Sequence, residues 1–349
     1  PVELRMRNLV REGSLTGTMM EVMPNCSTRE TLEAAAKAAG WVKTSEVWKR
    51  HQTHQEVRPG TLHGVGIASG WKNIGYTLGF QETSTATIEL YGEAEIERVV
   101  VRLPAAEVGQ GIQTTITQMV SEAFGVSSKQ IELLMPDTDE AESAGSVSAS
   151  RMALMAGNVL RGAAEAVLEK WKDEERPAIA THTYHAPLTE PMDPETGAAT
   201  GAFALAYVAQ AVEVEVDIET GHVKVTRIIS ANDVGRAINP KIVEGQIEGA
   251  AIQGMGWALM EDFVTKNGEV LTPGLSTYLI PTVLDVPEDF QSLILEENLP
   301  LGPWGVNGMG EMPLISIAPA ILDAVHDATG VWHSHIPLTP ERLLTGMDQ

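Results

Sequence analysis

The clearest pattern in the chain is a strict alternation of valine with acidic residues. Val212, Val214 and Val216 alternate with acidic positions, and the alternation resumes at Val223 after a Glu-Thr-Gly turn. A period of two places successive side chains on opposite faces of a strand. The pattern therefore predicts a hairpin over residues 203–228 with one buried face.

Apolar residues at helical spacing predict four longer helices, over residues 112–124, 147–171, 240–260 and 311–329. The third has the best-defined start, because Asn239 can cap it and Pro240 suits its first turn. Shorter apolar runs predict strands over residues 63–71, 86–91, 99–103 and 131–134. This mixture predicts an α+β fold with two mixed α/β subdomains.

The predicted organisation has three parts. Residues 1–55 form a helical, solvent-facing segment, in which Ser-Thr-Arg-Glu at residues 27–30 is typical of a capping box. Residues 56–175 form a first subdomain and residues 176–349 a second one. A loop over residues 173–202, rich in Pro, Thr, Glu and Gly, separates the two.

Composition narrows the class of protein. The 349 residues include 47 acidic and 24 basic ones, a formal charge of −23, which argues against nucleic acid or an anionic membrane as a partner. No apolar run approaches the roughly 18 residues of a membrane span. The single cysteine, Cys26, excludes a disulfide framework and an iron–sulfur cluster held by this chain alone. We expect a packing role for Cys26 and a cytoplasmic, reducing location.

Three glycine-bearing turns stand ahead of predicted helices, at residues 109–111, 145–150 and 308–310. Helix N-termini present free N–H groups and a positive dipole end, so the three turns together suggest an anionic ligand held by backbone donors. Each turn alone also fits a simple tight turn. None follows the spacing of a phosphate loop or of a dinucleotide-binding fold. His51 and His54 have a spacing that could bind a metal, but the favoured interpretation is a polar linker.

Two polar residues stand out against apolar surroundings. Glu311 follows a glycine-rich loop and precedes an apolar helix, which fits either a catalytic base or a carboxylate that complements the helix dipole. Gln253 lies within an otherwise apolar helix and is followed by two glycines, at positions 254 and 256. It bonds either neighbouring backbone or a ligand, and the glycines favour a ligand.

Five motifs occur in order along the chain: VGQG, GSVSASR, EGQIEGAAIQGMGWALMED, GPWGVNGMGEMPL and IPLTPERLL. In this order they resemble the C-terminal half of the molybdopterin-binding subunit of the xanthine dehydrogenase/aldehyde oxidase family of molybdenum hydroxylases. The resemblance covers nearly the whole chain. Asn307, where relatives often carry lysine, and Met312, where many carry proline, depart from the family pattern.

The resemblance implies a role for each motif. Glu311 matches the family's catalytic base, and Phe80 and Asn307 fall near its substrate pocket. The implied cofactor-binding residues are Val108, Gly109, Gln110, Gly111, Gly145, Ser146, Val147, Ser148, Ala149, Ser150, Arg151, Gln253 and Gly310. No protein side chain is expected to bind the molybdenum, because in this family the pterin holds the metal.

The resemblance also implies partners. The family's first half carries a Gly-Gly-Phe-Gly-Gly loop, and this chain has no Gly-Gly pair. The other half of the molybdenum subunit, the [2Fe–2S] subunit and the FAD subunit are therefore expected on separate chains, a split like that of nicotinate dehydrogenase. The implied cofactor is molybdopterin, in its cytosine dinucleotide form.

The implied reaction is the hydroxylation, with water, of an electron-poor carbon in a nicotinate-like, purine-like or aldehyde substrate. A cofactor-binding or assembly protein without catalysis is the alternative, and the joint presence of Gln110, Gln253 and Glu311 argues against it. A nucleotide-dependent dehydrogenase is disfavoured, because the strand–GxGxxG–helix unit is missing.

Overall fold

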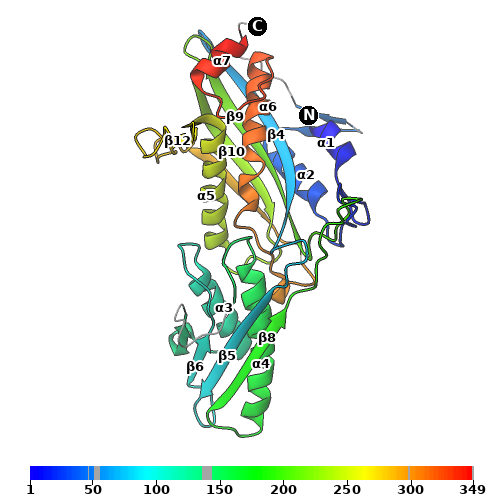
Figure 1. Ribbon diagram of the computed structural model, residues 1–349, viewed down its shortest axis with the longest axis vertical. Helices are drawn as coiled ribbons and strands as arrows, with labels where there is room; N and C mark the ends of the chain where they lie inside the picture. Colours follow the sequence, from blue (N-terminus) through cyan, green and yellow to red (C-terminus); the bar gives the residue numbers. More distant parts are fainter. Residues whose placement is uncertain (46, 51–55, 136–143, 298, 348–349) are drawn as a thin grey trace.

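Two sheets, each covered by helices, lie end to end in an elongated molecule (Figure 1). The computed structural model describes residues 1–45, 47–50, 56–135, 144–297 and 299–347. The predicted α+β class is confirmed. The first half of the chain contributes strands to both sheets, so its loops meet those of the second half where the sheets adjoin.

The larger sheet has five strands in the order β13 (Asp289–Leu295), β10 (Val223–Asp233), β9 (Leu205–Asp217), β4 (Thr61–Asn73) and β3 (Glu56–Arg58). β13 runs parallel to β10, and the other neighbours are antiparallel. β9 and β10 form the predicted hairpin. Its turn is held by the Asp217 carboxylate, which accepts the N–H groups of Glu219 and Thr220.

Helices cover both faces of this sheet. Val212, Val214 and Val216 face α5 (Pro240–Leu259) and α6 (Ile317–Thr329), as the alternation predicts. Ala209 and Ala211, earlier in β9 and on its opposite face, pack with α2 (Thr28–Ala38). The short helices α1 (Val2–Asn8) and α7 (Pro340–Met347) lie at the margins.

Glycines in β4 let α6 approach closely. A Cβ added at Gly64 or Gly66 would lie 2.1 Å from a carbonyl oxygen of α6, that of Ala324 or Ala320. Such a distance forbids any side chain at either position. The glycine-rich sequence of β4 therefore sets the helix-to-sheet spacing on this face.

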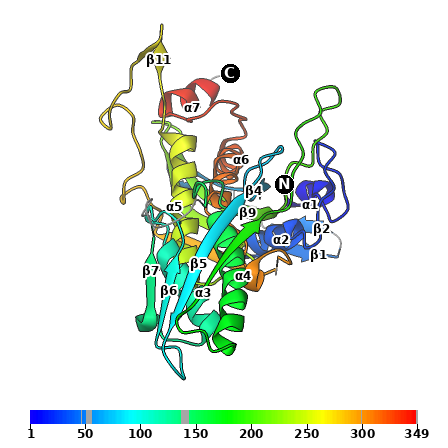
Figure 2. The same cartoon turned by 60° about the horizontal axis from the view of Figure 1, so that its bottom comes forward.

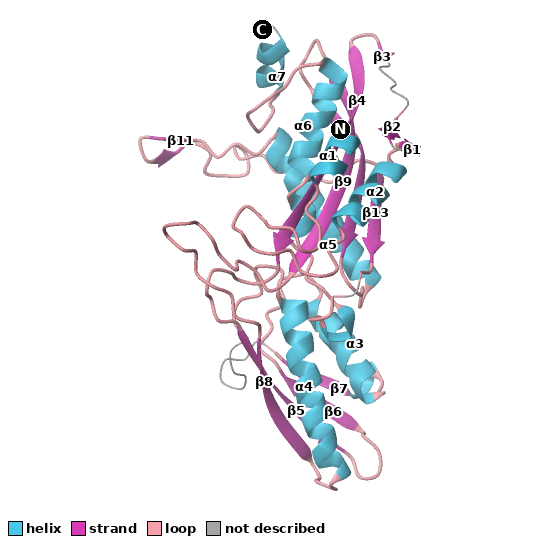
Figure 3. Cartoon of the chain, turned by 90° about the vertical axis from the view of Figure 1, so that its right-hand side faces the viewer, coloured by secondary structure: helices cyan, strands magenta, loops and turns pink. Residues whose placement is uncertain are grey.

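The smaller sheet has four strands in the order β7 (Ile131–Leu134), β6 (Arg98–Arg102), β5 (Thr83–Tyr91) and β8 (Ala178–His185). Helices α3 (Ile112–Phe124) and α4 (Met152–Lys172) pack on it around an aliphatic core, as Figure 2 and Figure 3 show. The remaining regular elements are short. They are β1 (Val42–Thr44), β2 (Val47–Lys49), β11 (Thr265–Lys266), β12 (Glu269–Val270) and the 3-10 segments Ser128–Gln130, Pro303–Gly305 and Met312–Leu314.

Sheet membership differs from the predicted domain boundaries. β4, predicted within the first subdomain, pairs along its whole length with β9 of the larger sheet. β8, inside the predicted boundary loop of residues 173–202, pairs with β5 of the smaller sheet. Its inward positions, Ala178, Ala180, His182 and Tyr184, include no Val, Ile or Leu, so the strand lacks the usual apolar alternation. His182 lies against Gly162 of α4. Pairing between distant segments, which no local pattern encodes, decides both memberships.

The N-terminal segment also differs from its prediction. α2 is not solvent-facing but packs on the larger sheet, and β1 and β2 follow it. The capping box is wrong: the Ser27 hydroxyl makes no cap and donates instead to the Asp233 carboxylate at 2.5 Å. Burial raises the pKa of Asp233 to about 6, although the hydroxyl and two backbone N–H groups oppose the rise. The serine therefore satisfies a buried carboxyl rather than the helix start.

Candidate functional site

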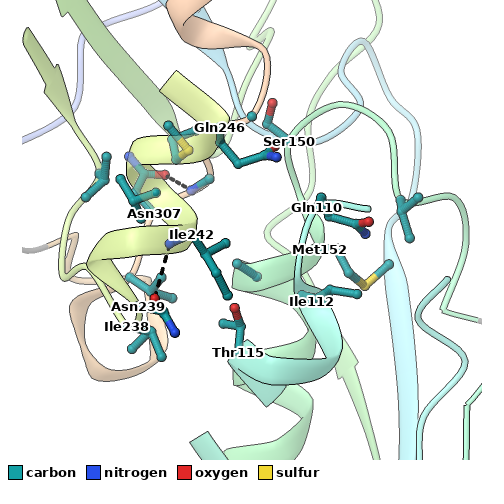
Figure 4. Close-up of a pocket in the computed structure, with 18 of the residues that line it drawn as sticks. Gln110, Ile112, Thr115, Ser150, Met152, Ile238, Asn239, Ile242, Gln246 and Asn307 are labelled. Carbon is teal, nitrogen blue, oxygen red and sulfur yellow. Dashed lines mark hydrogen bonds between the residues drawn. The ribbon is translucent and has the colours of Figure 1, made fainter. Parts of the chain in front are cut away.

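A pocket of about 280 Å³ opens where the two sheets adjoin. Its walls come from the loop before α3, the start of α4, the first half of α5 and the glycine-rich loop of residues 306–311. Figure 4 shows Ile242 and Gln246 of α5 on one side and Gln110 and Ile112 on the other. The predicted site residues Val108, Gln110, Val147, Ser150, Asn307, Gly310 and Glu311 all line it. Segments up to 200 residues apart thus meet at one site.

Glu311 is held by three donors from two other segments. Its Oε2 atom lies 2.8 Å from Lys72 Nζ, at the end of β4, and accepts the Ser150 hydroxyl at 3.0 Å. Its Oε1 atom accepts the N–H of Ala149 at 3.3 Å. The side chain is 48% exposed, and Lys72 is 19% exposed. The carboxylate therefore faces the pocket with its lysine partner behind it.

These contacts set the charge of Glu311. Burial by itself would raise the pKa of this carboxyl, but the Lys72 ammonium, the Ser150 hydroxyl and the Ala149 N–H outweigh it. The pKa of Glu311 consequently lies below its ordinary value. α6 begins only at Ile317. Glu311 therefore lies outside the first turn of that helix, and the interpretation of Glu311 as a carboxylate that complements the dipole of this helix does not hold.

The loop of residues 144–151 is fixed by buried partners. Arg151, predicted to contact the cofactor, points inward: it pairs with buried Glu82 and donates to the carbonyls of Ala144 and Ser146 at 2.8 and 2.7 Å. Its role is therefore to brace the loop. On the exposed side of the loop, the hydroxyls of Tyr76 and Ser148 form a hydrogen bond.

Backbone strain marks the part of this loop nearest the pocket. Ala149 and Ser150 both have positive φ, 60° and 53°, which delays the start of α4 to Met152. Gly308 lies against them, since a Cβ there would stand 1.7 Å from the Ser150 carbonyl oxygen. Gly145 also has a positive φ and lies beside the Arg151 guanidinium. Strain of this kind persists where packing over-determines it, and it is concentrated at functional sites.

The VGQG turn contradicts the prediction of free backbone donors. The Glu107 carboxylate already accepts the N–H groups of Gly109, Gly111 and Gln113, at 2.9, 3.0 and 3.2 Å. Burial would raise the pKa of Glu107, and these bonds lower it further than burial raises it. The start of α3 is therefore capped from within the chain. Gln110 folds back on its own turn, with bonds to Val108 N–H and the Ala106 carbonyl.

The glutamine of α5 that lines the pocket is not the predicted one. Gln253 is exposed and does not line the pocket. Gln246, two turns earlier on the same helix, lines it (Figure 4). Seven residues keep nearly the same helix face, but only the first half of α5 reaches the junction of the sheets. The motif contains both glutamines, and its spacing could not choose between them.

The two expected substrate-pocket residues also separate. Phe80 is 57% exposed, outside the pocket, and packs on Tyr76 with ring centroids 5.0 Å apart. Asn307 lines the pocket, but its amide donates to the Leu205 carbonyl at 2.9 Å and its carbonyl accepts the Gly308 N–H at 2.8 Å. Asn307 thus shapes the loop before Glu311.

Comparison with known proteins decides the family. Residues 40–177 and 169–287 match the molybdopterin cofactor-binding domain family. The chain belongs to that family. It is 31% identical to the xanthine dehydrogenase molybdenum-binding subunit of Escherichia coli, over 98% of this chain and 49% of that protein. It is 28% identical to the nicotine 6-hydroxylase large subunit of Paenarthrobacter nicotinovorans, over 99% of this chain and 47% of that protein.

A solved structure gives the same result. The aldehyde oxidoreductase of Desulfovibrio gigas superposes with a TM-score of 0.84 at 27% identity, over all of this chain and 38% of that one. This chain of the molybdopterin cofactor-binding family spans about half the length of the curated relatives it matches.

The pocket fits part of a polar, anionic cofactor of the kind this family binds. Within the described residues, no hydrogen bond or ion pair engages the Gln246 amide or the Arg236 guanidinium, and both side chains line the pocket. Donors left open beside an apolar wall suit a ligand with several acceptors. The volume is near the lower limit of about 300 Å³ for small-molecule sites, so this chain encloses only a portion of such a group.

Among residues 1–45, 47–50, 56–135, 144–297 and 299–347, no three His, Cys, Asp or Glu side chains are close enough to hold a metal ion. No helix in this part of the chain is long and apolar enough to cross a membrane. His51 and His54 lie outside the described residues.

Sequence reasoning missed four residues that matter at this molybdopterin-family site: Lys72, Glu107, Arg236 and Gln246. Lys72 closes a strand whose preceding residues are small or apolar, and an inward charge at a strand end could have signalled a partner. Glu107 precedes the glycine turn, where a capping carboxylate is common. Arg236 carries no local signal of its position.

Proposed function

We propose that this chain is the part of a molybdenum hydroxylase that carries the catalytic base, Glu311, and one side of the cofactor pocket. The reaction is the hydroxylation, with water, of an electron-poor carbon in an N-heteroaromatic or aldehyde substrate. One observation carries the proposal: an ionised carboxylate at the pocket wall, positioned by Lys72, Ser150 and Ala149. Family membership and the names of the relatives support the reaction class.

Each residue at the pocket has its own role in this proposal. When bound, the molybdenum cofactor supplies the two-electron redox chemistry. Glu311 takes up the proton of the water that becomes the product oxygen, at Oε1, the oxygen that the lysine does not engage. Lys72 keeps the carboxylate ionised, and the Ser150 hydroxyl fixes its orientation. Gln246 and Arg236 offer donors to the cofactor.

We also propose the finer features of the assembly. The cofactor is the cytosine dinucleotide form of molybdopterin. The remaining half of the molybdenum subunit completes the pocket, and [2Fe–2S] and FAD chains carry the electrons away. The half-length match to the relatives supports the first partner. The single cysteine supports placing the clusters on other chains, because one thiolate cannot hold one.

The test is Glu311→Gln in the assembled complex, purified through a tag on this chain. Hypoxanthine, nicotinate and benzaldehyde are each assayed with a dye as electron acceptor, and rates are expressed per bound molybdenum. We expect the wild-type complex to oxidise at least one of the three. Glu311→Gln should lower that rate by at least about 10²-fold, because a positioned general base contributes about 10²–10⁴.

The matched control is Glu165→Gln, an exposed carboxylate on α4. It should leave the rate unchanged, and both variants should keep wild-type molybdenum content. A molybdenum-loaded wild-type complex with no turnover of any of the three would favour the assembly protein. A near-normal rate in Glu311→Gln would exclude the role of Glu311 as base.

A further inference from the structure

Residues 261–288, here called the arm, leave the body between the end of α5 and the start of β13. Figure 1 and Figure 3 show the β11–β12 end of the arm standing away from both sheets. Its later part returns to the body, where Pro281 packs on Gly256 of α5 and Leu284 lines a cavity beside the start of β10. The regular structure of the arm is the small ribbon of β11 and β12. A segment this long without packed secondary structure is unusual in a compact domain and is often functional.

The arm carries a large share of the exposed apolar surface. Ten of the 26 exposed large hydrophobic side chains in the described residues lie between Phe263 and Val286. Leu284 is 92% exposed, Val283 85% and Leu275 71%. A cluster of this kind on a protein surface marks a contact site for another macromolecule.

The arm is nevertheless held in a definite shape. The Tyr278 hydroxyl donates to the Glu261 carboxylate at 2.6 Å, and Arg342 pairs with Asp262 at 3.1 Å, which fixes its base. Near the exposed leucine, the Asp285 carboxylate accepts both the N–H and the hydroxyl of Thr282. These bonds hold the backbone of the arm in one conformation, so its apolar side chains keep fixed positions.

One side of α5 joins the arm to the pocket. Gly245, Gly249, Gln253 and Trp257, here called the ridge, follow one another at four-residue spacing and are all exposed. Within the described residues, no heavy atom outside the helix backbone and the neighbouring residues lies within 4 Å of a Cβ built at either glycine. The ridge thus offers another backbone a close approach, and its tryptophan leads into the arm.

From this continuity we infer that the ridge and the arm form the docking surface for the remaining half of the molybdenum subunit. The relatives are about twice as long as this chain, which supports a further region of similar size beside it. A partner that completes the pocket at the first half of α5 must continue along the ridge. The arm holds five acidic residues and one lysine, so the partner presents an apolar groove with a basic rim. The identity of the partner rests on the proposed function, whereas the position of the docking surface rests on the exposed residues of the ridge and the arm.

Photo-crosslinking tests the surface in the assembled complex. A photoreactive amino acid replaces Leu284 or Trp257, and Trp332, 65% exposed at the end of α6, serves as the matched control. We expect the first two to cross-link to a polypeptide whose sequence aligns with the remaining half of the relatives, as identified by mass spectrometry. The control should not cross-link to it. Links to a second copy, to an iron–sulfur or flavin chain, or to nothing would overturn the proposal.

A paired variant measures the contribution of the arm. Val283→Asp with Leu284→Asp should reduce the amount of that polypeptide recovered with this chain by at least tenfold. The amount of this chain itself recovered through its tag should match wild type, because both side chains are exposed. Glu311→Gln should leave recovery intact, so loss of docking and loss of catalysis are distinguishable. Undiminished recovery in the paired variant would contradict the proposal.

Discussion

Glu107 precedes Val108 of one pocket wall and Glu311 lines the opposite one, but the two carboxylates are held in different ways. Within the described part of the chain, the hydrogen bonds of Glu107 go to backbone N–H groups no more than six residues away. Glu311 is held by Lys72 from the larger sheet and by Ala149 and Ser150 from the loop before α4. The first carboxylate stabilises a local turn, whereas the second exists in its geometry only once distant segments have assembled.

The donors differ in kind as well as in distance. Fixed N–H dipoles hold Glu107, so its lowered pKa depends on the turn alone. A lysine charge contributes to the lowered pKa of Glu311, so a single substitution far along the chain can change it. The proton affinity of Glu311 is thus set in part by another side chain, whereas backbone N–H groups lower that of Glu107.

Among variants that leave Glu311 itself unchanged, the largest effect should come from Gly308→Ala, which breaks the Glu311 side of the comparison. The added Cβ would stand 1.7 Å from the Ser150 carbonyl oxygen, so the loop that carries Ala149 and Ser150 must move. We expect turnover per bound molybdenum to fall by at least about tenfold, and the free energy of unfolding to fall by about 1–3 kcal/mol. Gly201→Ala, at a glycine with open space around it, is the control. Wild-type turnover in Gly308→Ala would show that the loop does not position Glu311.

A smaller effect is expected from Lys72→Met, which removes the charge and keeps most of the side-chain volume. Lys72 lowers the pKa of Glu311, so its loss should raise that pKa and move the acid limb of the kcat/KM profile to higher pH. Turnover on the acid side should fall by about threefold to tenfold, a fraction of the roughly 10²–10⁴ that a positioned base contributes. Turnover on the alkaline side should change least.

Two further variants separate charge from packing at this position. Lys72→Arg restores the positive charge and should return the acid limb toward the wild-type pH. Lys172→Met, at the end of α4, should leave the profile unaltered. An acid limb that stays in place in Lys72→Met would mean that the lysine does not set the charge of Glu311.

The same contrast explains what could be predicted from the sequence. The hairpin and the presence of four longer helices follow from local periodicity, and Asn239 caps α5 as predicted. α4 and α6 begin later than predicted, at Met152 and Ile317. β8 was missed, because its inward positions include His182 and Tyr184 in place of aliphatic residues, and because it pairs with β5, far earlier in the chain. At the site, Glu311 could be found from its glycine-rich loop, whereas Gln110 was named only through the family resemblance. The pairing of Lys72 with Glu311 could not be found, since nothing near residue 311 encodes it.

The smallest effect should come from Glu107→Gln, which breaks the local side of the comparison. Glutamine keeps one acceptor oxygen but sets an amide donor against the remaining N–H groups, so the start of α3 should lose about 0.5–1 kcal/mol. Because the pKa of Glu107 is lower in the folded protein than its ordinary value of 4.5, the charged form contributes stability above that pH. This contribution is lost as the pH falls through the folded-state pKa.

The melting temperatures of wild type and variant should therefore differ at pH 7 and converge in acid, while Glu169→Gln, exposed on α4, shows neither change. Turnover should stay within about twofold of wild type. The electrostatic effect of a capping carboxylate is confined to the first turn of its helix, so it should not change the proton affinity of Glu311. A loss of turnover as large as that of Lys72→Met would mean that the two carboxylates act together, and the distinction between a local and an assembled carboxylate would not hold.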